Sequence, residues 1–263
     1  MTIPTSTVTK TAVGTEKLLL SRFSVGVGDR FAHQAKAQLQ ACQLAVEDGV
    51  EITTVWNKSN REHQTVGFEP GTVLAAAERA VSELGWKLPF HCDADHITLK
   101  TVDRFIASCD FYTLDVADCI GLPAEASSVT SFVAAHPELQ QRIELTGKAG
   151  VLQLSASEVE RYASKYLFAV KSAAQIYRHI AEAKGEGKFI TEVSMDETDT
   201  PQTMAEMRES NAQGEEDPSA WARLGRRRWA ICAMLSIAAS GSLLVLFLVV
   251  LIAPGLKKVE LAA

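Results

Sequence analysis

The sequence predicts an α/β fold built on a parallel sheet, in the form of an incomplete β/α barrel of the TIM type. From residue 18 to about residue 200, short apolar runs alternate with amphipathic helical segments. Parallel neighbours in a sheet need such crossover helices. Polar residues cluster just after each predicted strand, where a β/α barrel forms the mouth of its active site. We count about six units where a closed barrel needs eight, so a doubly wound open sheet is the alternative.

The first two predicted units occupy the region before residue 64. Phe23 to Val27 is a short apolar strand, and Asp29 can cap the helix that follows it. Val50 to Trp56 is rich in β-branched residues and forms the second strand. The polar run from Asn57 to His63 then predicts a loop at the carboxyl end of that strand.

The third and fourth units follow the same pattern. Gly71 opens a helix with an apolar face at helical spacing, and Gly85 is its expected stop. Leu88 to Cys92 is the third strand, and it runs directly into Asp93-Ala94-Asp95-His96. Phe111 to Val116 is the fourth strand.

The last units lie between the fourth strand and residue 203. Arg142 to Leu145 is a candidate fifth strand. Ser157 and Glu160 have the spacing of a capping box, which predicts the start of a long helix. Phe189 to Val193 is the sixth strand.

The composition excludes some classes of function. The chain has 263 residues, of which 47% are hydrophobic, so it can bury a sizeable core. Its net charge of −6 argues against a nucleic-acid partner, which would call for a basic face. A few local cationic side chains can still hold an anionic small molecule. Five cysteines at wide spacings fit a reduced, cytoplasmic chain.

The domain organisation changes after the predicted barrel. We expect a flexible N-terminus over residues 1–17, the partial barrel domain over 18–203 and a polar linker over 204–228. Residues 229–253 contain no charge and exceed the roughly 20 apolar residues that a membrane-spanning helix needs. We therefore predict a hydrophobic C-terminal helix there. Three arginines directly before it favour a cytoplasmic N-terminal part if the helix spans a membrane.

The main candidate for chemistry is the run His91-Cys92-Asp93-Ala94-Asp95-His96. It places two carboxylates and two imidazoles at the end of a strand, and these groups suit a divalent cation such as Zn²⁺ or Mn²⁺. On a strand, His91, Asp93 and Asp95 share one face, and a bend would bring Asp95 and His96 to the same cavity. Any one of them alone is as well explained by a turn cap or a core histidine. Four together favour a site.

Glu192 is the second candidate. It lies inside an otherwise apolar strand, so it faces either solvent or a barrel interior. A lone buried carboxylate is costly unless it is paired or protonated, which makes Glu192 a reasonable general acid. For Asp196, Glu197 and Asp199 beyond it, a solvated turn is the better interpretation.

The run after the second strand supplies candidate substrate contacts. Lys58 and Arg61 can hold a substrate carboxylate, and Asn60 between them is a further polar contact. A solvated loop explains these residues about as well. The segment Gly26 to Arg30 lacks the third glycine of a dinucleotide fingerprint, so little supports a nicotinamide cofactor.

Five motifs, taken in order, resemble the tagaturonate epimerase family from about Ser21 to Thr203. They are Ser24-Val-Gly-Val-Gly-Asp-Arg-Phe-Ala-His33, Val55-Trp-Asn-Lys-Ser-Asn-Arg-Glu-His63, His91-Cys-Asp-Ala-Asp-His96, Tyr162-Ala-Ser-Lys-Tyr-Leu-Phe-Ala-Val170 and Phe189-Ile-Thr-Glu-Val-Ser-Met-Asp-Glu-Thr198. The resemblance implies a metal-dependent β/α-barrel enzyme that interconverts D-tagaturonate and D-fructuronate in hexuronate breakdown. It further implies that Asp95 is the proton acceptor, Glu192 the proton donor and His96 a ligand of a divalent cation. His91, Lys58, Asn60, Arg61 and Asp93 complete the predicted site as substrate contacts.

The resemblance ends near Thr203, where members of this family continue for roughly as long again. A truncated or frameshifted gene is our first explanation, and a membrane-anchored variant is the other. A barrel that stops there leaves sheet edges exposed and supplies one likely ligand where a catalytic zinc has three or more. We therefore expect family membership but little activity from this polypeptide. Another metal-dependent barrel aldolase or isomerase acting on a ketose, or a non-catalytic membrane-associated remnant, are the alternatives.

Overall fold

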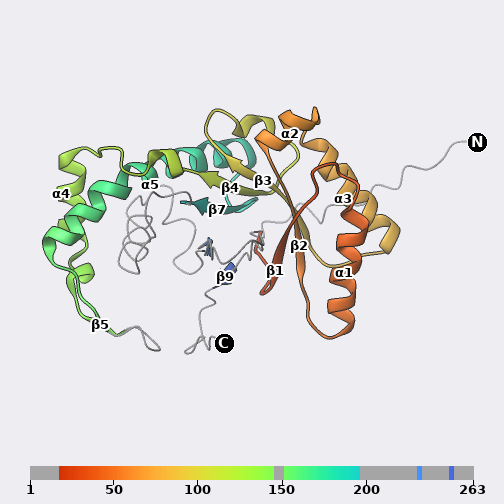
Figure 1. Cartoon of the computed structure of the whole chain (residues 1–263), viewed down its shortest axis with the longest axis horizontal. Coiled ribbons are helices and arrows are strands. Elements are labelled where there is room, and N and C mark those ends of the chain that lie inside the picture. Colours follow the sequence, from red (N-terminus) through yellow and green to blue (C-terminus); the bar gives the residue numbers. More distant parts are fainter. Residues whose placement is uncertain (1–17, 145–150, 196–229, 233–248, 252–263) are drawn as a thin grey trace, which may run out of the picture. The chain divides into compact units, whose positions relative to one another are not determined.

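The structure, a computed structural model, describes residues 18–144, 151–195, 230–232 and 249–251 (Figure 1). Its main sheet is parallel and has five strands in the order β1-β2-β3-β4-β7. These strands are β1 (Ser24–Gly28), β2 (Thr53–Ser59), β3 (Phe90–Ile97), β4 (Phe111–Asp115) and β7 (Ile190–Ser194). The predicted α/β class with a parallel sheet is therefore confirmed.

Helices connect these strands. The α-helices are α1 (Ala35–Glu47), α2 (Asn60–Val66), α3 (Gly71–Leu84), α4 (Ala126–Ala135) and α5 (Ala156–Lys184), and the short 3-10 helices are η1 (Val102–Arg104), η2 (Ala117–Cys119) and η3 (Pro137–Gln140). The chain divides into two compact units, which we describe separately. The first unit comprises Met1–Asp95, Asp103–Tyr112 and Ala181–Ile190, and the second comprises His96–Val102, Thr113–Ile180 and Thr191–Ala263.

The strand order follows the chain without a reversal. β1 pairs in parallel with β2, and β2 pairs in parallel with β3. A doubly wound sheet reverses its strand order at a switch point, whereas a β/α barrel does not. The order therefore agrees with the barrel prediction better than with the alternative. The five strands of this sheet are fewer than the eight that close a barrel.

In the first unit, α1 and α3 lie on one side of β1 and β2 (Figure 1). Trp56 is 1% exposed, and its indole Nε1 donates to Gln38 Oε1 of α1 at 3.0 Å. Thr54 Oγ1 lies 3.0 Å from the Cys42 sulfur of the same helix. Because side chains alternate along a strand, Thr54 and Trp56 face the helices and Asn57 faces the opposite side of the sheet.

The polar run after β2 forms α2, so our prediction of a loop there was wrong. Ser59 caps this helix, since its Oγ accepts from the Glu62 amide at 3.2 Å. Glu62 Oε2 in turn accepts from the Ser59 amide at 3.2 Å. This is a complete capping box, and its sequence signature was present in Ser59-Asn-Arg-Glu62. Gly67, with φ of 69°, ends the helix.

A single guanidinium holds both ends of α2. Arg104 Nη1 donates to Asn60 Oδ1 at 2.9 Å, at the start of the helix. Its Nη2 donates to the Phe68 carbonyl at 3.1 Å, and its Nε and Nη2 each donate to the Glu69 carboxylate at 3.0 Å. The segment that follows β2 is thereby fixed to the segment that follows β3.

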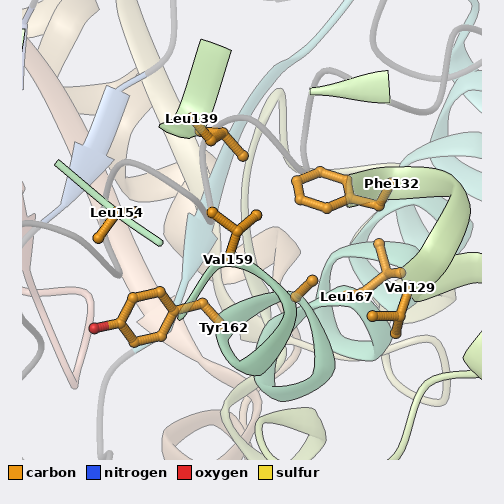
Figure 2. Close-up of a cluster of buried hydrophobic side chains, with 8 residues drawn as sticks. Val129, Phe132, Leu139, Leu154, Val159, Tyr162 and Leu167 are labelled. Carbon is orange, nitrogen blue, oxygen red and sulfur yellow. The ribbon is translucent and has the colours of Figure 1, made fainter. Parts of the chain in front are cut away.

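The second unit has a hydrophobic core between α4 and α5 (Figure 2). The cluster consists of Val129, Phe132, Leu139, Leu154, Val159, Tyr162, Ala163 and Leu167. α5 starts at a capping box two residues earlier than we predicted. Ser155 and Glu158 form it, since the Glu158 amide donates to Ser155 Oγ at 3.3 Å and Glu158 Oε2 accepts from the Ser155 amide at 2.8 Å.

The candidate fifth strand is not part of the parallel sheet. Ile143–Glu144 is β5, and it pairs antiparallel with β6 (Val151–Leu152). The apolar side of α4 is occupied by α5, so α4 does not serve as a crossover helix onto the sheet. The fifth strand is instead β7, which follows the long helix α5.

The predicted C-terminal helix falls mostly outside the described residues, as do residues 1–17 and the predicted linker. Within 229–253 the structure describes β8 (Ala230–Cys232) and β9 (Val249–Leu251), which pair antiparallel. At these two segments the structure has strands, so the helix prediction was wrong there. No helix in the described ranges is long and apolar enough to cross a membrane.

Gly85 ends α3 with φ of 62°, in the left-handed region that L side chains rarely adopt. An added Cβ would meet no atom within 4 Å, so the cost of Gly85→Ala is conformational. We expect this change to lower the free energy of unfolding by about 1 kcal/mol in urea titrations. Gly71→Ala is the control, because the nearest atom to its added Cβ is Ser108 Oγ at 3.7 Å and no positive φ is involved. An equal loss of unfolding free energy in both variants would contradict the conclusion that the left-handed backbone at Gly85 causes the effect.

Candidate functional site

The backbone bends at His96, close to the carboxyl end of β3. His96 has φ of 51°, which is uncommon for a residue with a side chain. Such a conformation costs on the order of 1–3 kcal/mol and persists only where the surrounding structure enforces it, often at functional sites. The bend that we expected at this strand end is therefore present, and it takes His96 out of the regular alternation of β3.

In the second unit, the His96 ring lies against the end of β7. His96 Nε2 is 3.5 Å from the Oγ of Ser194, a side chain that is 7% exposed. The Ser194 carbonyl also accepts from the Val116 amide at 3.3 Å, which fixes the end of β7 beside the end of β4. Alternation places Glu192 on the same face of β7 as Ser194, roughly 7 Å along the strand. The ring of the predicted metal ligand therefore contacts the residue of β7 that shares a strand face with the predicted proton donor.

In the first unit, a polar row crosses the face of the sheet opposite α1. Asn57 of β2 stands in register with Gly28 of β1 and with Asp93 of β3, and Ser59 stands in register with Asp95. The Asn57 amide fills the space beside Gly28, since its Oδ1 lies 3.4 Å from where a Cβ would be. Asp93 is 6% exposed and Asp95 is half-buried. Two carboxylates of the predicted run therefore share this face with an amide.

Asn57 was not among our candidates, although the sequence held a signal for it. It precedes Ser59 by two residues at the end of a buried strand, which is the spacing of one sheet face. Our strand prediction ended at Trp56, so we assigned Asn57 to the loop that we expected after the strand.

His91 lies at the other end of β3. Its Nδ1 is 3.2 Å from Asp110 Oδ2, and Asp110 Oδ1 accepts from the Cys92 amide at 3.0 Å. The ring is 1% exposed, so it is a buried histidine oriented by a carboxylate. Four residues of strand, roughly 13 Å, separate it from Asp95. The structure therefore does not bring His91 together with Asp95, although both belong to the same predicted run.

Asn60 and Arg61 do not converge on that face either. The Asn60 side chain is bound by Arg104 at the start of α2. Arg61 is exposed on the same helix. Their predicted role as substrate contacts stays a prediction.

Lys58 is buried on the helix side of β2. It shares a face with Trp56 and is 1% exposed. Its Nζ has no hydrogen-bond partner among the described residues and lies 5.0 Å from the centroid of the Phe68 ring. Burial lowers the pKa of Lys58, and the negative charges of Glu62 and Asp29 counteract that effect in part.

His63, on the same short helix as Asn60, is also buried and was missed because we read this segment as a loop. It is 1% exposed, its ring packs edge-on against Phe105, and its Nδ1 has no hydrogen-bond partner in the described ranges. Burial lowers the pKa of His63 to about 4, and the positive charges of Lys58 and Arg104 add to that effect. His63 is therefore neutral at pH 7.

The residues with metal-binding chemistry are not gathered into one complete site in the part of the chain that the structure describes. No group of three or more His, Cys, Asp or Glu is arranged there to hold a metal ion. His96 and Glu192 nevertheless offer an imidazole and a carboxylate, the donor types that Zn²⁺ and Mn²⁺ accept. The donor chemistry fits a divalent cation, and the number of donors is below that of a complete site.

His63 makes the stability of the fold depend on pH. Its pKa of about 4 in the folded chain lies below the ordinary value of 6.5, so between these values only the unfolded chain takes up the proton. The contribution to stability is complete above pH 6.5 and is lost as the pH falls toward 4. Three charged residues, Lys58, Arg104 and Glu69, act on the ring.

We expect the free energy of unfolding to fall by up to about 3 kcal/mol between pH 7 and pH 4 through this group. His63→Leu should flatten the pH dependence measured by urea unfolding, because Leu takes up no proton. His33→Leu is the control, since His33 is exposed. An unchanged slope in His63→Leu would show that other groups carry the pH dependence.

Comparisons with known proteins place this geometry in a family. A model of the tagaturonate epimerase family, UxaE, matches residues 12–207. No curated protein matches the chain.

Three solved structures of the fructuronate-tagaturonate epimerase UxaE from Cohnella laeviribosi resemble the chain. The complex with one glycerol has a TM-score of 0.56 at 22% identity and covers 73% of this chain and 41% of its own. The complex with two glycerols has a TM-score of 0.54 at 21% identity, with coverages of 74% and 42%. The native structure has a TM-score of 0.51 at 21% identity, with coverages of 71% and 40%.

At these identities the likeness concerns the fold, and the chain spans about two fifths of the length of those structures. The family match extends over residues 12–207 and includes both the bend at His96 and the strand of Glu192. On that match, the chain belongs to the tagaturonate epimerase family.

Proposed function

We propose that this chain carries part of the active site of an enzyme that epimerises D-tagaturonate to D-fructuronate with a divalent cation. The observation that carries the proposal is the bend at His96, which turns Nε2 toward the face of β7 that holds Glu192. The unreversed order of the five parallel strands supports the view that they are the first part of a β/α barrel.

We propose a role for each polar residue near the carboxyl ends of β3 and β7. Asp95 is the proton acceptor, Glu192 is the proton donor and His96 is a ligand of Zn²⁺ or Mn²⁺. A cation held there would stabilise negative charge on the substrate oxygens. Asp93 is supported as a substrate contact because it shares a face of β3 with Asp95. His91, Lys58, Asn60 and Arg61 stay predictions for that role.

The substrate sets what these residues must do. The two keto acids differ at a carbon β to the ketone, so simple enolisation does not acidify its hydrogen. In a retro-aldol route, Asp95 takes the proton of the hydroxyl on that carbon, and the bond to the neighbouring carbon beside the ketone breaks. One fragment becomes an aldehyde, and the electron pair of the broken bond leaves the other fragment as the enolate of the ketone. The aldehyde turns over, the bond re-forms with opposite configuration, and Glu192 returns a proton to the new alkoxide. In a direct route, the base removes the hydrogen from the carbon and the acid returns one to the opposite face.

Activity of the full chain tests the proposal. We expect the chain to convert D-tagaturonate to D-fructuronate slowly in the presence of Mn²⁺ or Zn²⁺, because it carries only part of the site. NMR follows the conversion, which should stop when a chelator is added. Asp95→Asn and Glu192→Gln should each lower kcat by 10²-fold or more, since a positioned acid or base contributes about 10²–10⁴. Glu83→Gln, an exposed carboxylate paired with Lys36, is the matched control.

Conversion at the wild-type rate by the Asp95 and Glu192 variants would contradict these roles. Cleavage of the substrate without recombination would point instead to an aldolase. His96→Ala should also weaken binding of Mn²⁺, which electron paramagnetic resonance measures independently of turnover.

A deuterium label at the inverted carbon separates the two routes. The retro-aldol route leaves the C–D bond intact, so the product should retain the label. The direct route passes the hydrogen through an acid and a base, so the label should be lost to water. Mass spectrometry of the product in H₂O distinguishes the outcomes, and full loss of the label would exclude the retro-aldol route.

A further inference from the structure

Two glycines of β1 lie on one face of the sheet in the first unit. Gly26 and Gly28 are in register with Val55 and Asn57 of β2, so they lie on the face opposite α1. Neither has a positive φ, so the backbone does not require glycine there. A glycine inside a strand weakens it and often marks a bulge, a bend or the close approach of another group. The pairing of β1 with β2 runs unbroken through both glycines, which favours the close approach of another group.

The surface over these glycines is open in the described part of the chain. Both glycines are exposed. Among the described residues, a Cβ added at Gly26 would meet only Asn57 Nδ2, at 3.6 Å, and one added at Gly28 would meet only Asn57 Oδ1, at 3.4 Å. The Asn57 amide therefore lies along β1 and borders this open area. We call Gly26, Gly28 and Asn57 the Asn57 surface.

The Asn57 amide keeps its own hydrogen-bonding groups for a ligand. The side chain is half-buried, and it has no hydrogen-bond partner among the residues that the structure describes. A side-chain amide offers two N–H donors and an acceptor oxygen. A hydroxyl group matches both, because it donates one hydrogen bond and accepts others, whereas a carboxylate only accepts. The amide therefore suits a ligand that carries hydroxyl groups.

The charges beside Asn57 disfavour an anionic group at this place. Asp93 is in register with Asn57, and Asp95 lies two residues farther along β3 on the same face. Within β1, β2 and β3, Lys58 is the one lysine or arginine, and it lies on the opposite face. Two carboxylates repel a further carboxylate or a phosphate, but they accept hydrogen bonds from hydroxyl groups.

We infer that Asn57 binds a hydroxyl group of the sugar-acid substrate, with the carbon chain of the substrate over the two glycines of β1. The carboxylate of the substrate then points away from the acidic residues of β3. Strand spacing places the Cα atoms of Asn57 and Asp95 roughly 8 Å apart, so their side chains can reach neighbouring hydroxyl groups of one carbon chain. This inference rests on the proposed epimerase function, because that reaction supplies the ligand. It adds a substrate contact on β2 and an orientation of the substrate.

NMR titration of the isotope-labelled full chain tests the inference, with a chelator present so that no turnover occurs. The probes are D-tagaturonate and D-tagatose, which has a CH₂OH group in place of the carboxylate. We expect the wild-type chain to bind both sugars. Asn57→Ala should raise both Kd values by the same factor of about 3- to 10-fold, the contribution of one neutral hydrogen bond. Gln40→Ala is the matched control, since it removes an exposed amide from α1 and should leave both Kd values unchanged.

Gly26→Val fills the open area and keeps the strand. Valine favours strands, and the nearest described atom to the added Cβ lies at 3.6 Å, an ordinary contact distance. We expect both Kd values to rise by about 10-fold or more, because the new side chain occupies the space of the substrate. The Tm should stay equal or rise. Val25→Ile is the matched control, since it adds a methylene to the other face of β1 and should keep both Kd values.

The outcomes separate this inference from the proposed function. If the wild-type chain binds neither sugar, both are overturned. If it binds both sugars and either Asn57→Ala or Gly26→Val binds them as the wild type does, only this inference is overturned. A loss of affinity in Asn57→Ala that is confined to D-tagaturonate would place the substrate carboxylate at Asn57, and this result also overturns the inference. Wild-type binding of D-tagaturonate alone does the same, because it assigns the affinity to the carboxylate.

The side-chain amide resonances of Asn57 in the wild-type chain provide a readout that needs no variant. Either sugar should shift them in proportion to the bound fraction, and the amide resonances of Gln40 should stay in place. Asn57 resonances that do not move at saturating sugar would overturn the inference, whatever the variants show.

Discussion

The alternation of side chains along β1, β2 and β3 is the constraint on which the placement of the candidate site residues depends. These strands are parallel and in register, so one pleat decides the face of every residue near their carboxyl ends. Trp56 packs on α1, and this contact assigns Lys58 to the helix side and Asn57 to the other side. Asp93 and Asp95 lie on the same side as Asn57, because they are in register with Asn57 and Ser59. The burial of Trp56 therefore determines on which face of the sheet each of these charged residues lies.

The bend at His96 is the place where the alternation stops. A regular strand would direct His96 to the face opposite Asp95, because the two residues are consecutive. The left-handed φ removes that restriction and brings Nε2 to Ser194 of β7. The strain is local and costs a few kcal/mol at most, which a well-packed strand can sustain. A site that needs an imidazole beside β7 thus depends on one unfavourable backbone angle.

The sequence was sufficient for the features that depend on neighbouring residues. The strands and their parallel order followed from apolar runs and intervening helices, and the end of α3 followed from Gly85. It was insufficient where distant segments decide the outcome. Ile143–Glu144 was read as a sheet strand because nothing local shows that α4 packs on α5. His63 was missed because we read its segment as a loop, and its contact with Phe105, far away in the chain, is not visible in the local sequence. The capping box of α2 was a local signal that we overlooked.

The separation of charge across β2 and β3 has a chemical consequence. A carboxylate that acts as a proton acceptor is a weaker base beside a cation, because a cation at hydrogen-bond distance lowers the pKa of a carboxyl. A slip of β2 by one residue would move Lys58 to the face of Asp93 and Asp95 and place Asn57 under the helices. The contact between Trp56 and Gln38 opposes this slip, since it would turn the indole away from α1. The register that buries Trp56 therefore also keeps the ammonium of Lys58 on the face of the sheet opposite the proposed base.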